Sequence, residues 1–407
     1  MAATGWRLVD VYAPDLYISQ GGQLVRRTVF TDEHEAFRQM ARQFVAREVV
    51  PHYEEWEQQG APPRQFYKRL GELGILGIQI PAEYGGSGER SYKYSAVLTE
   101  ETLGAKVGLG SLRVHMDIVL PYLLSYCTDE QKRRWLPGAA TGDLLTAIAM
   151  TEPGTGSDLA GITTTAVRDG DRFILNGSKT FITGGVNADL ILVVARTSSV
   201  DEKDRRAGLS ILVVDAAAEG YAVVRNLAKL GLKAQDTTEL HFDNVSVPVE
   251  NLLGEEGRAF QYLGHNLAQE RLSIAVGSQA AATAALTSTI DYVRERTVFG
   301  KPLSSMQNTK FVLAGCATDI EAGQALVDRA LEDHDRGELT AVDAAKVKLF
   351  CTELQGRVVD ACLQLYGGYG YMLEYPIARL YADARVTRIY GGTSEIMKTI
   401  ISKSLGL

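Results

Sequence analysis

Residues 147–158 read AIAMTEPGTGSD, and the rest of the chain is organised around this stretch. A short apolar run ends abruptly at Thr151, and Pro153 followed by Gly154 favours a tight loop. Such a loop exposes backbone N–H groups and the hydroxyls of Thr151 and Ser157, which can hydrogen-bond a flat polar heterocycle or a phosphate. The alternative is an ordinary strand–loop–strand turn, because clusters of Gly, Pro and Ser are usually no more than loops.

Downstream of this loop the sequence predicts short strands. Asp169-Gly170 is a strong hairpin signal between two of them, and residues 239–243 alternate as a half-buried strand should. No helical pattern intervenes, so we expect an antiparallel sheet or small barrel up to about residue 253. Residues 198–206 predict a charged surface loop. The strand signals lie at residues 163–167, 172–175, 190–195, 209–214 and 239–243.

On both sides of the strands the pattern is helical. Thr31 followed by two acidic residues is a helix start, and apolar residues recur at helical spacing until Pro51 ends the run. Upstream we also expect helices at residues 63–74, 91–103 and 129–139. Downstream we expect four long helices, which should pack as a bundle, at residues 259–296, 304–336, 341–366 and 383–405.

The composition is that of an ordinary globular protein, with 45% apolar and 23% charged residues. A chain of 407 residues suggests about two or three domains. Its 42 basic and 50 acidic residues give a net charge of −8, which argues against nucleic acid or an anionic membrane surface as the main partner. The four cysteines and six histidines show no metal-ligand spacing, so we expect no metal site.

No apolar run is long enough to cross a bilayer, so we expect no membrane insertion. Residues 1–23 carry Asp10 and Asp15 but only one basic residue, Arg7. A mitochondrial presequence is rich in arginine and poor in acids, and a secretory signal has a basic start and an apolar core. We therefore expect a cytoplasmic protein.

Glu270 lies in the apolar stripe of the first long helix. Leu263, Leu267 and Ile274 stand at i−7, i−3 and i+4 from it, so the four side chains share one face. Burial disfavours a charged carboxylate and raises its pKa above about 4.3, which a general base acting near neutral pH requires. The alternatives are an ion pair with a basic neighbour, or a position at the edge of the stripe.

The loop sequence MTEPGTGSD at residues 150–158 resembles the first signature of the acyl-CoA dehydrogenases. Other motifs of that family follow in the same order: KLGLK at 229–233, RTVFG at 296–300, the run at 364–375 and IYGGTSEI at 389–396. The similarity runs from about residue 28 to residue 405, and the chain looks most like the long-chain acyl-CoA dehydrogenases. The resemblance implies an α+β fold with an N-terminal extension at 1–26, an N-terminal helical domain at 27–146, a middle antiparallel β domain at 147–254 and a C-terminal four-helix bundle domain at 255–407.

The resemblance also implies which residue is the catalytic base. Most relatives place a glutamate immediately before the Gly-Thr-Ser of the last motif, where this chain has Gly391. The long-chain and isovaleryl branches carry it instead within Glu-Arg-Leu on the long helix, which is Glu270 to Leu272 here. The implied reaction is α,β-dehydrogenation of an acyl-CoA thioester. Glu270 takes the α-proton, the β-hydrogen leaves as hydride to FAD, and the Gly391 N–H helps to stabilise the thioester oxygen.

The resemblance nominates further binding residues. Arg296 is expected at the FAD diphosphate, where a guanidinium matches phosphate oxygens. The other FAD-binding residues that it implies are Ile148, Met150, Thr151, Gly156, Ser157, Phe181, Thr183, Phe299, Gln307, Gln364, Gly367, Gly368, Thr393 and Glu395, some of them reaching the flavin of a neighbouring subunit. Substrate contacts are implied for Ser157, Arg271 and Gly392. The alternatives are a simple helix-ending turn at residues 367–370 and a solvated or structural Arg271.

An enzyme of this kind would pass its electrons to an electron-transfer flavoprotein and form a homotetramer through its C-terminal helices. Longer straight acyl chains are expected, although the sequence does not fix chain length or branching. One alternative keeps the fold but takes a short branched acyl-CoA, takes an acyl chain on a carrier protein, or uses oxygen as acceptor. Another is a flavin- or acyl-CoA-binding scaffold without turnover, which the missing glutamate at Gly391 suggests.

Overall fold

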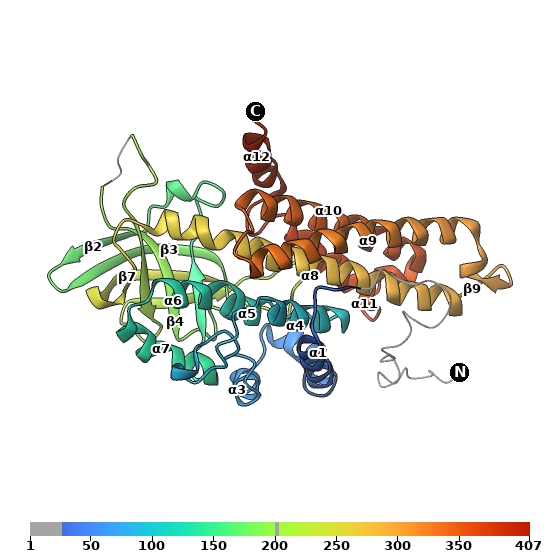
Figure 1. Ribbon diagram of the computed structural model, residues 1–407, viewed down its shortest axis with the longest axis horizontal. Coiled ribbons are helices and arrows are strands. Elements are labelled where there is room, and N and C mark those ends of the chain that lie inside the picture. Colours follow the sequence, from blue (N-terminus) through green and yellow to red (C-terminus); the bar gives the residue numbers. More distant parts are fainter. Residues whose placement is uncertain (1–26, 200–202) are drawn as a thin grey trace.

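The computed structural model describes residues 27–199 and 203–407, so the expected N-terminal extension lies outside the described residues. Figure 1 shows a sheet at one end of the molecule, a group of helices from the first part of the chain along one side, and long helices from the last part that extend to the other end. Helix α8 (Ala259–Glu295) runs from the sheet to the far end of these long helices (Figure 1).

The first region is helical, as the pattern predicts. Its helices are α1 (Asp32–Phe44), α2 (Tyr53–Gln59), α3 (Arg64–Glu72), α4 (Lys93–Gly104), α5 (Gly110–Arg113), α6 (Leu120–Tyr126) and α7 (Asp129–Thr141). Helix α7 starts with a capping box: the Thr128 hydroxyl accepts a bond from the Gln131 N–H at 3.2 Å, and the Gln131 side chain accepts one from the Thr128 N–H at 2.9 Å. Two backbone donors at the helix start are thereby satisfied.

Two features of this region differ from the prediction. Pro51 does not end the first helical run, because the chain continues through a π turn (Val45–Val49) and a 3₁₀ turn (Val50–His52) into α2. Proline is tolerated there because the first turn of a helix lacks intrahelical N–H bonds anyway. Helices α5 and α6, joined by a π turn (Val114–Val119), were not expected. From residue 110 to residue 126, nine of 17 residues are buried and only Ser125 is exposed, so no polar face marks a helical period.

The middle region is one sheet. Its strands are β1 (Thr146–Ala149), β2 (Thr165–Asp169), β3 (Arg172–Thr183), β4 (Leu190–Arg196), β5 (Leu209–Asp215), β6 (Tyr221–Asn226), β7 (Thr237–Pro248) and β8 (Leu252–Leu253). They follow the order β6-β7-β3-β2-β4-β5-β8, with β1 beside β4. The β2–β3 hairpin forms as predicted, with Asp169 opposite Arg172 and Gly170 at a φ of 61°.

Most neighbours in the sheet are antiparallel, but β4 pairs in parallel with β1 and with β2. The segment between β1 and β4 is long enough to hold the signature loop and the β2–β3 hairpin, so the chain can return to the sheet in the same direction. Strand β6 was also not expected. It is almost wholly exposed, so burial imposes no alternation on its sequence.

The last region contains α8, α9 (Gln307–Asp335), α10 (Ala341–Tyr366), α11 (Pro376–Thr387) and α12 (Ser394–Ser404), with a small hairpin of β9 (Thr297–Val298) and β10 (Lys301–Pro302) after α8. The expectation of one helix over residues 383–405 was wrong. Gly391 and Gly392 have φ values of 61° and 96°, which are left-handed conformations that interrupt a helix. The chain therefore forms two helices joined by a glycine turn.

One hydrophobic core joins all three regions. Leu120 and Trp135 from the first region, Leu192 and Ile211 from the sheet and Leu263 from α8 belong to the same buried cluster. The first turns of α8 are therefore fixed against both other regions. The next turns carry Glu270 to the place where the three regions meet.

Candidate active site

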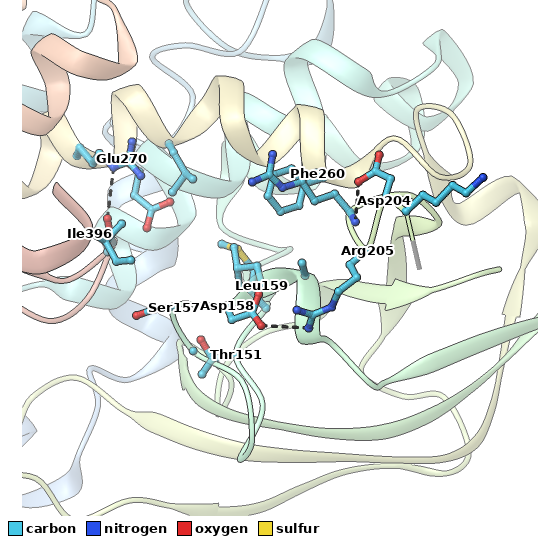
Figure 2. A pocket seen from close by; sticks show the side chains of 18 residues that line it. Thr151, Ser157, Asp158, Leu159, Asp204, Arg205, Phe260, Glu270 and Ile396 are labelled. Atoms are coloured by element: carbon cyan, nitrogen blue, oxygen red, sulfur yellow. Dashed lines mark hydrogen bonds and ion pairs between the residues drawn. The ribbon is translucent and has the colours of Figure 1, made fainter. Parts of the chain in front are cut away.

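A cleft of about 720 Å³ lies where α8, the loop after β1 and the turn before α12 meet. Figure 2 shows Glu270 and Phe260 on α8 at one side of it, and Thr151, Ser157 and Asp158 on the loop at the other. The cleft brings together the following residues singled out from the sequence: Met150, Thr151, Gly156, Ser157, Glu270, Arg271, Gly391 and Gly392.

A buried ion pair holds the loop after β1. Lys179 of β3 is fully buried, and its Nζ donates to Glu152 Oε1 and to the Met150 carbonyl oxygen, both at 2.9 Å. Glu152 accepts three more bonds from Thr163 and Thr164 at 2.7–2.9 Å. Burial by itself would raise the pKa of Glu152, but Lys179 and these donors lower it to about 2. The carboxylate stays charged, and the loop is tied to β3 and to the segment before β2.

Glu270 is the most unusual polar group of the cleft. Only 9% of its surface is exposed, and Oε2 is buried without a hydrogen-bond partner within the described residues. Leu263 and Ile274 on the same face are buried, as the stripe predicts. Burial raises the pKa of Glu270, and Arg271 and Lys348 lower it by a smaller amount. The position is therefore not the solvated edge of a stripe, and one carboxylate oxygen is free to accept a proton.

The glycine turn before α12 lies directly against this carboxylate. A Cβ atom placed on Gly391 would lie 3.6 Å from Glu270 Oε1 and 2.4 Å from Ile274 Cδ1. Arg271 Nε donates to the Gly391 carbonyl at 3.4 Å, and Lys348 Nζ donates to the Gly392 carbonyl. Across the two described ranges, no protein hydrogen bond uses the Gly391 N–H. That N–H is a free backbone donor beside a buried carboxylate.

Arg271 is not a solvated side chain. Only 6% of its surface is exposed, and burial lowers its pKa while Glu270 raises it. Consecutive residues of a helix point in different directions, but Arg271 and Glu270 both line the cleft. The guanidinium thus contributes a positive charge to the cleft and one bond to the glycine turn.

The end of β3 lies beside the loop, because the Thr180 N–H donates to the Thr151 carbonyl at 2.9 Å. Phe181 has a φ of 61° and 66% of its surface is exposed. A bulky residue in a left-handed conformation is strained, and an exposed aromatic ring gains nothing from burial that would offset this. Thr183 accepts a bond from Gln235 Nε2 at 3.1 Å, and Ile148 lies on β1. Neither they nor Phe181 line the cleft itself.

Another group of nominated residues lies at the far end of the long helices. Arg296 directly follows α8 and is roughly 39 Å from Glu270, at about 1.5 Å per helical residue. Its guanidinium lies over the Tyr369 ring at 5.4 Å. The same end holds Phe299, Gln307, Gln364, Gly367 and Gly368, and Phe299 is 98% exposed. Residues 367–371 form a 3₁₀ turn that ends α10, so the local form there is a helix end.

Thr393 and Glu395 directly follow the glycine turn in sequence. Thr393 caps α12, since its hydroxyl accepts a bond from the Ile396 N–H at 3.3 Å. Glu395 lies in the first turn of that helix and is exposed. Neither residue lines the cleft, although Gly391, Gly392 and Ile396 beside them do.

The residues around the loop fit a flavin. The exposed ring of Phe181 can stack on a flat heterocycle, and Gly154 and Gly156 face open space, so backbone N–H groups of the loop can approach a ligand closely. Glu270, whose Oε2 is buried and unpartnered within the described residues, lines the cleft. The hydroxyls and backbone donors of the loop are of the type that binds an isoalloxazine edge.

The sequence argument missed several residues that line the cleft or lie next to its lining. Lys203, Asp204, Arg205 and Arg206 line its mouth, although this loop was expected to be only a charged surface loop. Lys348 is 1% exposed and was not singled out. It stands on the buried face of α10 with Ala344, Cys351 and Gln355, so the argument that identified Glu270 in an apolar stripe could have found it.

Family models match nearly all of the described chain. The acyl-CoA dehydrogenase N-terminal domain matches residues 31–143, the middle domain matches residues 147–245, and the C-terminal domain matches residues 257–406. The chain belongs to the acyl-CoA dehydrogenase family, whose members are FAD-dependent oxidoreductases that act on CH–CH bonds. The expected family, the helical, β and helical fold and the FAD cofactor are thereby confirmed.

Individual relatives agree with this assignment. The chain is 43% identical to the long-chain specific acyl-CoA dehydrogenase of Sus scrofa mitochondria over 93% of this chain and 88% of that protein. It is 47% identical to an acyl-CoA dehydrogenase from Geobacillus kaustophilus, whose crystal structure covers 94% of this chain and 100% of its own with a TM-score of 0.92. A Mycobacterium smegmatis glutaryl-CoA dehydrogenase in complex with FADH2 is 31% identical over 93% and 95% of the two chains, with a TM-score of 0.85.

In the described part of the chain, no helix is both long enough and apolar enough to cross a membrane.

The buried Glu152–Lys179 pair should stabilise the signature loop strongly. Lys179→Met leaves a buried carboxylate without its cation, which we expect to lower the free energy of unfolding by about 3–5 kcal/mol at neutral pH. The pKa of Glu152 is lowered in the folded state, so the pair stabilises the protein above pH 4.5, and this contribution is lost as the pH falls toward about 2. The difference between variant and wild type in denaturant unfolding should therefore shrink over that interval. Burial lowers the pKa of Lys179 to about 8, so the ion pair is also lost above that pH.

Arg225→Met is the matched control, because Arg225 and Glu239 form a similar pair, with a 2.7 Å contact, on the surface of the same sheet. That substitution should leave the unfolding midpoint nearly unchanged. Equal effects of the two substitutions would contradict the proposed importance of the buried pair.

Proposed function

We propose that the protein dehydrogenates a saturated acyl-CoA thioester to the trans-2-enoyl-CoA, with Glu270 as the base. The observation that carries this proposal is the buried, unpartnered Oε2 of Glu270 beside the Gly391 turn in the cleft. Proton abstraction needs a base and a donor that stabilises the negative charge that develops. The carboxylate with its raised pKa supplies the base, and the free backbone N–H beside it supplies the donor. The long-chain relatives support a substrate with a longer straight acyl chain.

Different residues of this chain have different roles in that reaction. Glu270 Oε2 accepts the α-proton, and the apolar residues around it exclude water. The Gly391 N–H donates to the thioester oxygen, which gains negative charge as the α-proton leaves. Arg271 and Lys348 hold the turn through the two glycine carbonyls. FAD, when bound, supplies the hydride acceptor for the β-hydrogen. Ser157, Arg271 and Gly392 are the proposed contacts to the substrate.

The FAD-binding residues fall into two groups that one chain keeps far apart. Ile148, Met150, Thr151, Gly156, Ser157, Phe181 and Thr183 would bind the isoalloxazine, with Thr393 and Glu395 nearby. Arg296, Phe299, Gln307, Gln364, Gly367 and Gly368 would contact the flavin of a neighbouring subunit. This separation supports a homotetramer built on the C-terminal helices. The family models, which match residues 31–143, 147–245 and 257–406, support the proposed division into domains at residues 27–146, 147–254 and 255–407.

An electron-transfer flavoprotein is the proposed acceptor of the electrons, and the cytoplasm is the proposed location. There are four competing proposals. In three of them the protein is an enzyme that takes a carrier-protein thioester as substrate, takes a short branched acyl-CoA as substrate, or uses oxygen as electron acceptor. In the fourth it is a scaffold without turnover. Anaerobic addition of straight, branched and carrier-bound acyl thioesters to the FAD-loaded protein separates them. Bleaching of the flavin by a long straight acyl-CoA supports the proposed function, whereas no bleaching by any thioester supports the scaffold.

Glu270→Gln tests the base directly. The amide preserves the shape of the side chain but cannot accept the proton, so FAD and acyl-CoA should still bind while flavin reduction slows by about 10²–10⁴-fold. Stopped-flow absorbance of the flavin under anaerobic conditions measures this rate. Glu255→Gln, an exposed carboxylate just before the same helix, is the control and should reduce at the wild-type rate. Reduction of the Glu270→Gln flavin at the wild-type rate would show that the base lies elsewhere.

Gly391→Glu in the Glu270→Gln background should restore part of that rate, because position 391 adjoins the same carboxylate site. The new side chain needs space, since its Cβ would approach Ile274 Cδ1 to 2.4 Å, and the left-handed φ strains it further. Adding Ile274→Ala should therefore increase the rescue. Gly391→Glu alone should slow the enzyme, because two adjacent carboxylates raise each other's pKa. A triple variant that retains FAD but is no faster than Glu270→Gln would refute the rescue.

Arg296→Ala should weaken FAD retention more than it slows flavin reduction in fully loaded protein. A charge-assisted bond to phosphate is lost, which corresponds to about 1.5–3 kcal/mol of binding free energy. Calorimetric titration of the apoprotein with FAD measures this, and sedimentation velocity reports the oligomeric state. Arg294→Ala, an exposed arginine two residues earlier, is the matched control. Equal FAD affinity of the two variants would assign Arg296 a structural role only.

A further inference from the structure

Lys348 is a buried lysine at the active site that none of the roles above explains fully. It stands on α10 with 1% of its surface exposed, and its aliphatic chain reaches the glycine turn, with Cε 3.8 Å from a Cβ placed on Gly391. Its ammonium group donates to the Gly392 carbonyl oxygen. Burying an ammonium group is costly unless it is well paired, and an apolar residue of the same length would fill the space at lower cost. Packing alone therefore does not explain why a lysine occupies position 348, and a functional role would explain it.

The segment around the glycine turn is held mainly by side chains of α10. Glu353 Oε1 accepts a bond from the Ser394 hydroxyl at 2.6 Å, and Gln355 Oε1 accepts one from the Thr387 hydroxyl at 3.1 Å. These two bonds hold the residues on either side of the turn. Lys348 acts on the turn itself, where its bond to Gly392 complements the bond from Arg271 of α8 to Gly391.

Such anchors matter because the turn consists of two successive glycines. Both have positive φ values, and glycine moves between such conformations at little energetic cost. The direction of the Gly391 N–H depends on the orientation of the adjoining peptide units. Arg271 binds the Gly391 carbonyl and Lys348 binds the Gly392 carbonyl, and both bonds limit rotation of the peptide units in the turn. The Gly391 N–H therefore keeps one direction relative to Glu270.

We propose that Lys348 is a positioning residue that orients the Gly391 N–H for catalysis and keeps a positive charge beside Glu270. This inference rests on the proposed function, in which that N–H polarises the thioester and Glu270 takes the proton. Lys348 itself exchanges no proton with the substrate. It acts through the glycine turn and through the electrostatic field at the carboxylate.

The charged and titratable groups around Glu270 agree with the second part of this role. Arg271 faces Glu270 from the same helix, Lys348 from α10, Tyr122 from α6, and Tyr390 from the start of the turn. Burial raises the pKa of Glu270, and the two cations lower it. Burial, Arg271, Glu270 and Glu353 together set the pKa of Lys348 at about 8. Removing Lys348 should therefore raise the pKa of Glu270 further.

Lys348→Met and Lys348→Gln separate the two effects. Met fills the space but lacks both donor and charge, and Gln keeps an N–H donor without the charge. With Met we expect flavin reduction at saturating acyl-CoA to slow by about tenfold to a hundredfold, the size expected for a lost charge-assisted bond. The acid limb of its pH profile should move to higher pH. Gln should recover part of the rate but keep the displaced acid limb.

A spectroscopic readout reports the N–H without turnover. Isotope-edited infrared spectra of a bound trans-2-enoyl-CoA, labelled with carbon-13 at the carbonyl, measure how strongly its carbonyl is polarised. In Lys348→Met the stretch should shift toward its value in water, while FAD content and thermal unfolding stay close to wild type. Lys346→Met, an exposed lysine on the same helix, is the matched control and should change none of these quantities.

The outcomes are distinct. Wild-type rate, pH profile and carbonyl stretch in Lys348→Met would overturn the inference. Loss of FAD, or unfolding of both variants at lower temperature with an unchanged carbonyl stretch, would overturn it too, because Lys348 would then be only structural. Failure of the proposed base would appear instead in Glu270→Gln, which leaves Lys348 and its bond in place.

Discussion

The active site depends on keeping one carboxylate buried without a dedicated partner. A charged carboxylate in an apolar cavity is costly, and a protein can offset this by pairing it, by neutralising it or by placing cations close by. Glu270 keeps Oε2 free, while Arg271 and Lys348 act on it electrostatically and spend their hydrogen bonds on the neighbouring glycine turn. Nearby cations therefore stabilise the carboxylate, and one of its oxygens stays free to accept a proton.

Helix α8 links this site to the rest of the molecule. Its first turns pack into the core shared by all three regions, and its last residues reach the far end of the bundle, where Arg296 follows. A single rigid helix thus sets the separation between the base and a second group of polar residues. A binding site that needs both groups must then be completed by another copy of the chain, which is the physical reason for expecting an oligomer.

Two positions far apart in sequence meet at the candidate site. Glu270 and Gly391 are neighbours in space, since a Cβ on Gly391 would lie 3.6 Å from the Glu270 carboxylate. A carboxylate carried by position 391 would adjoin the Glu270 carboxylate, and the two would raise each other's pKa. Where α8 supplies the acid, the turn is free to carry glycine, whose small size and left-handed conformation suit a backbone donor.

The sequence by itself determined the order of helical, strand and helical regions, the β2–β3 hairpin and the candidate base. Each of these has a local signal in the sequence: the spacing of apolar residues, the turn residues, and a carboxylate within an apolar stripe. It could not reveal α5 and α6, which have almost no exposed residue to mark a helical face, or β6, which is almost wholly exposed, nor the break between α11 and α12. Only the tertiary structure decided that Lys179 holds Glu152, that Arg205 and Arg206 line the cleft, and that Lys348 meets the glycine turn. These contacts join residues from separate elements, and long-range packing, which no local period encodes, determines which side chains meet.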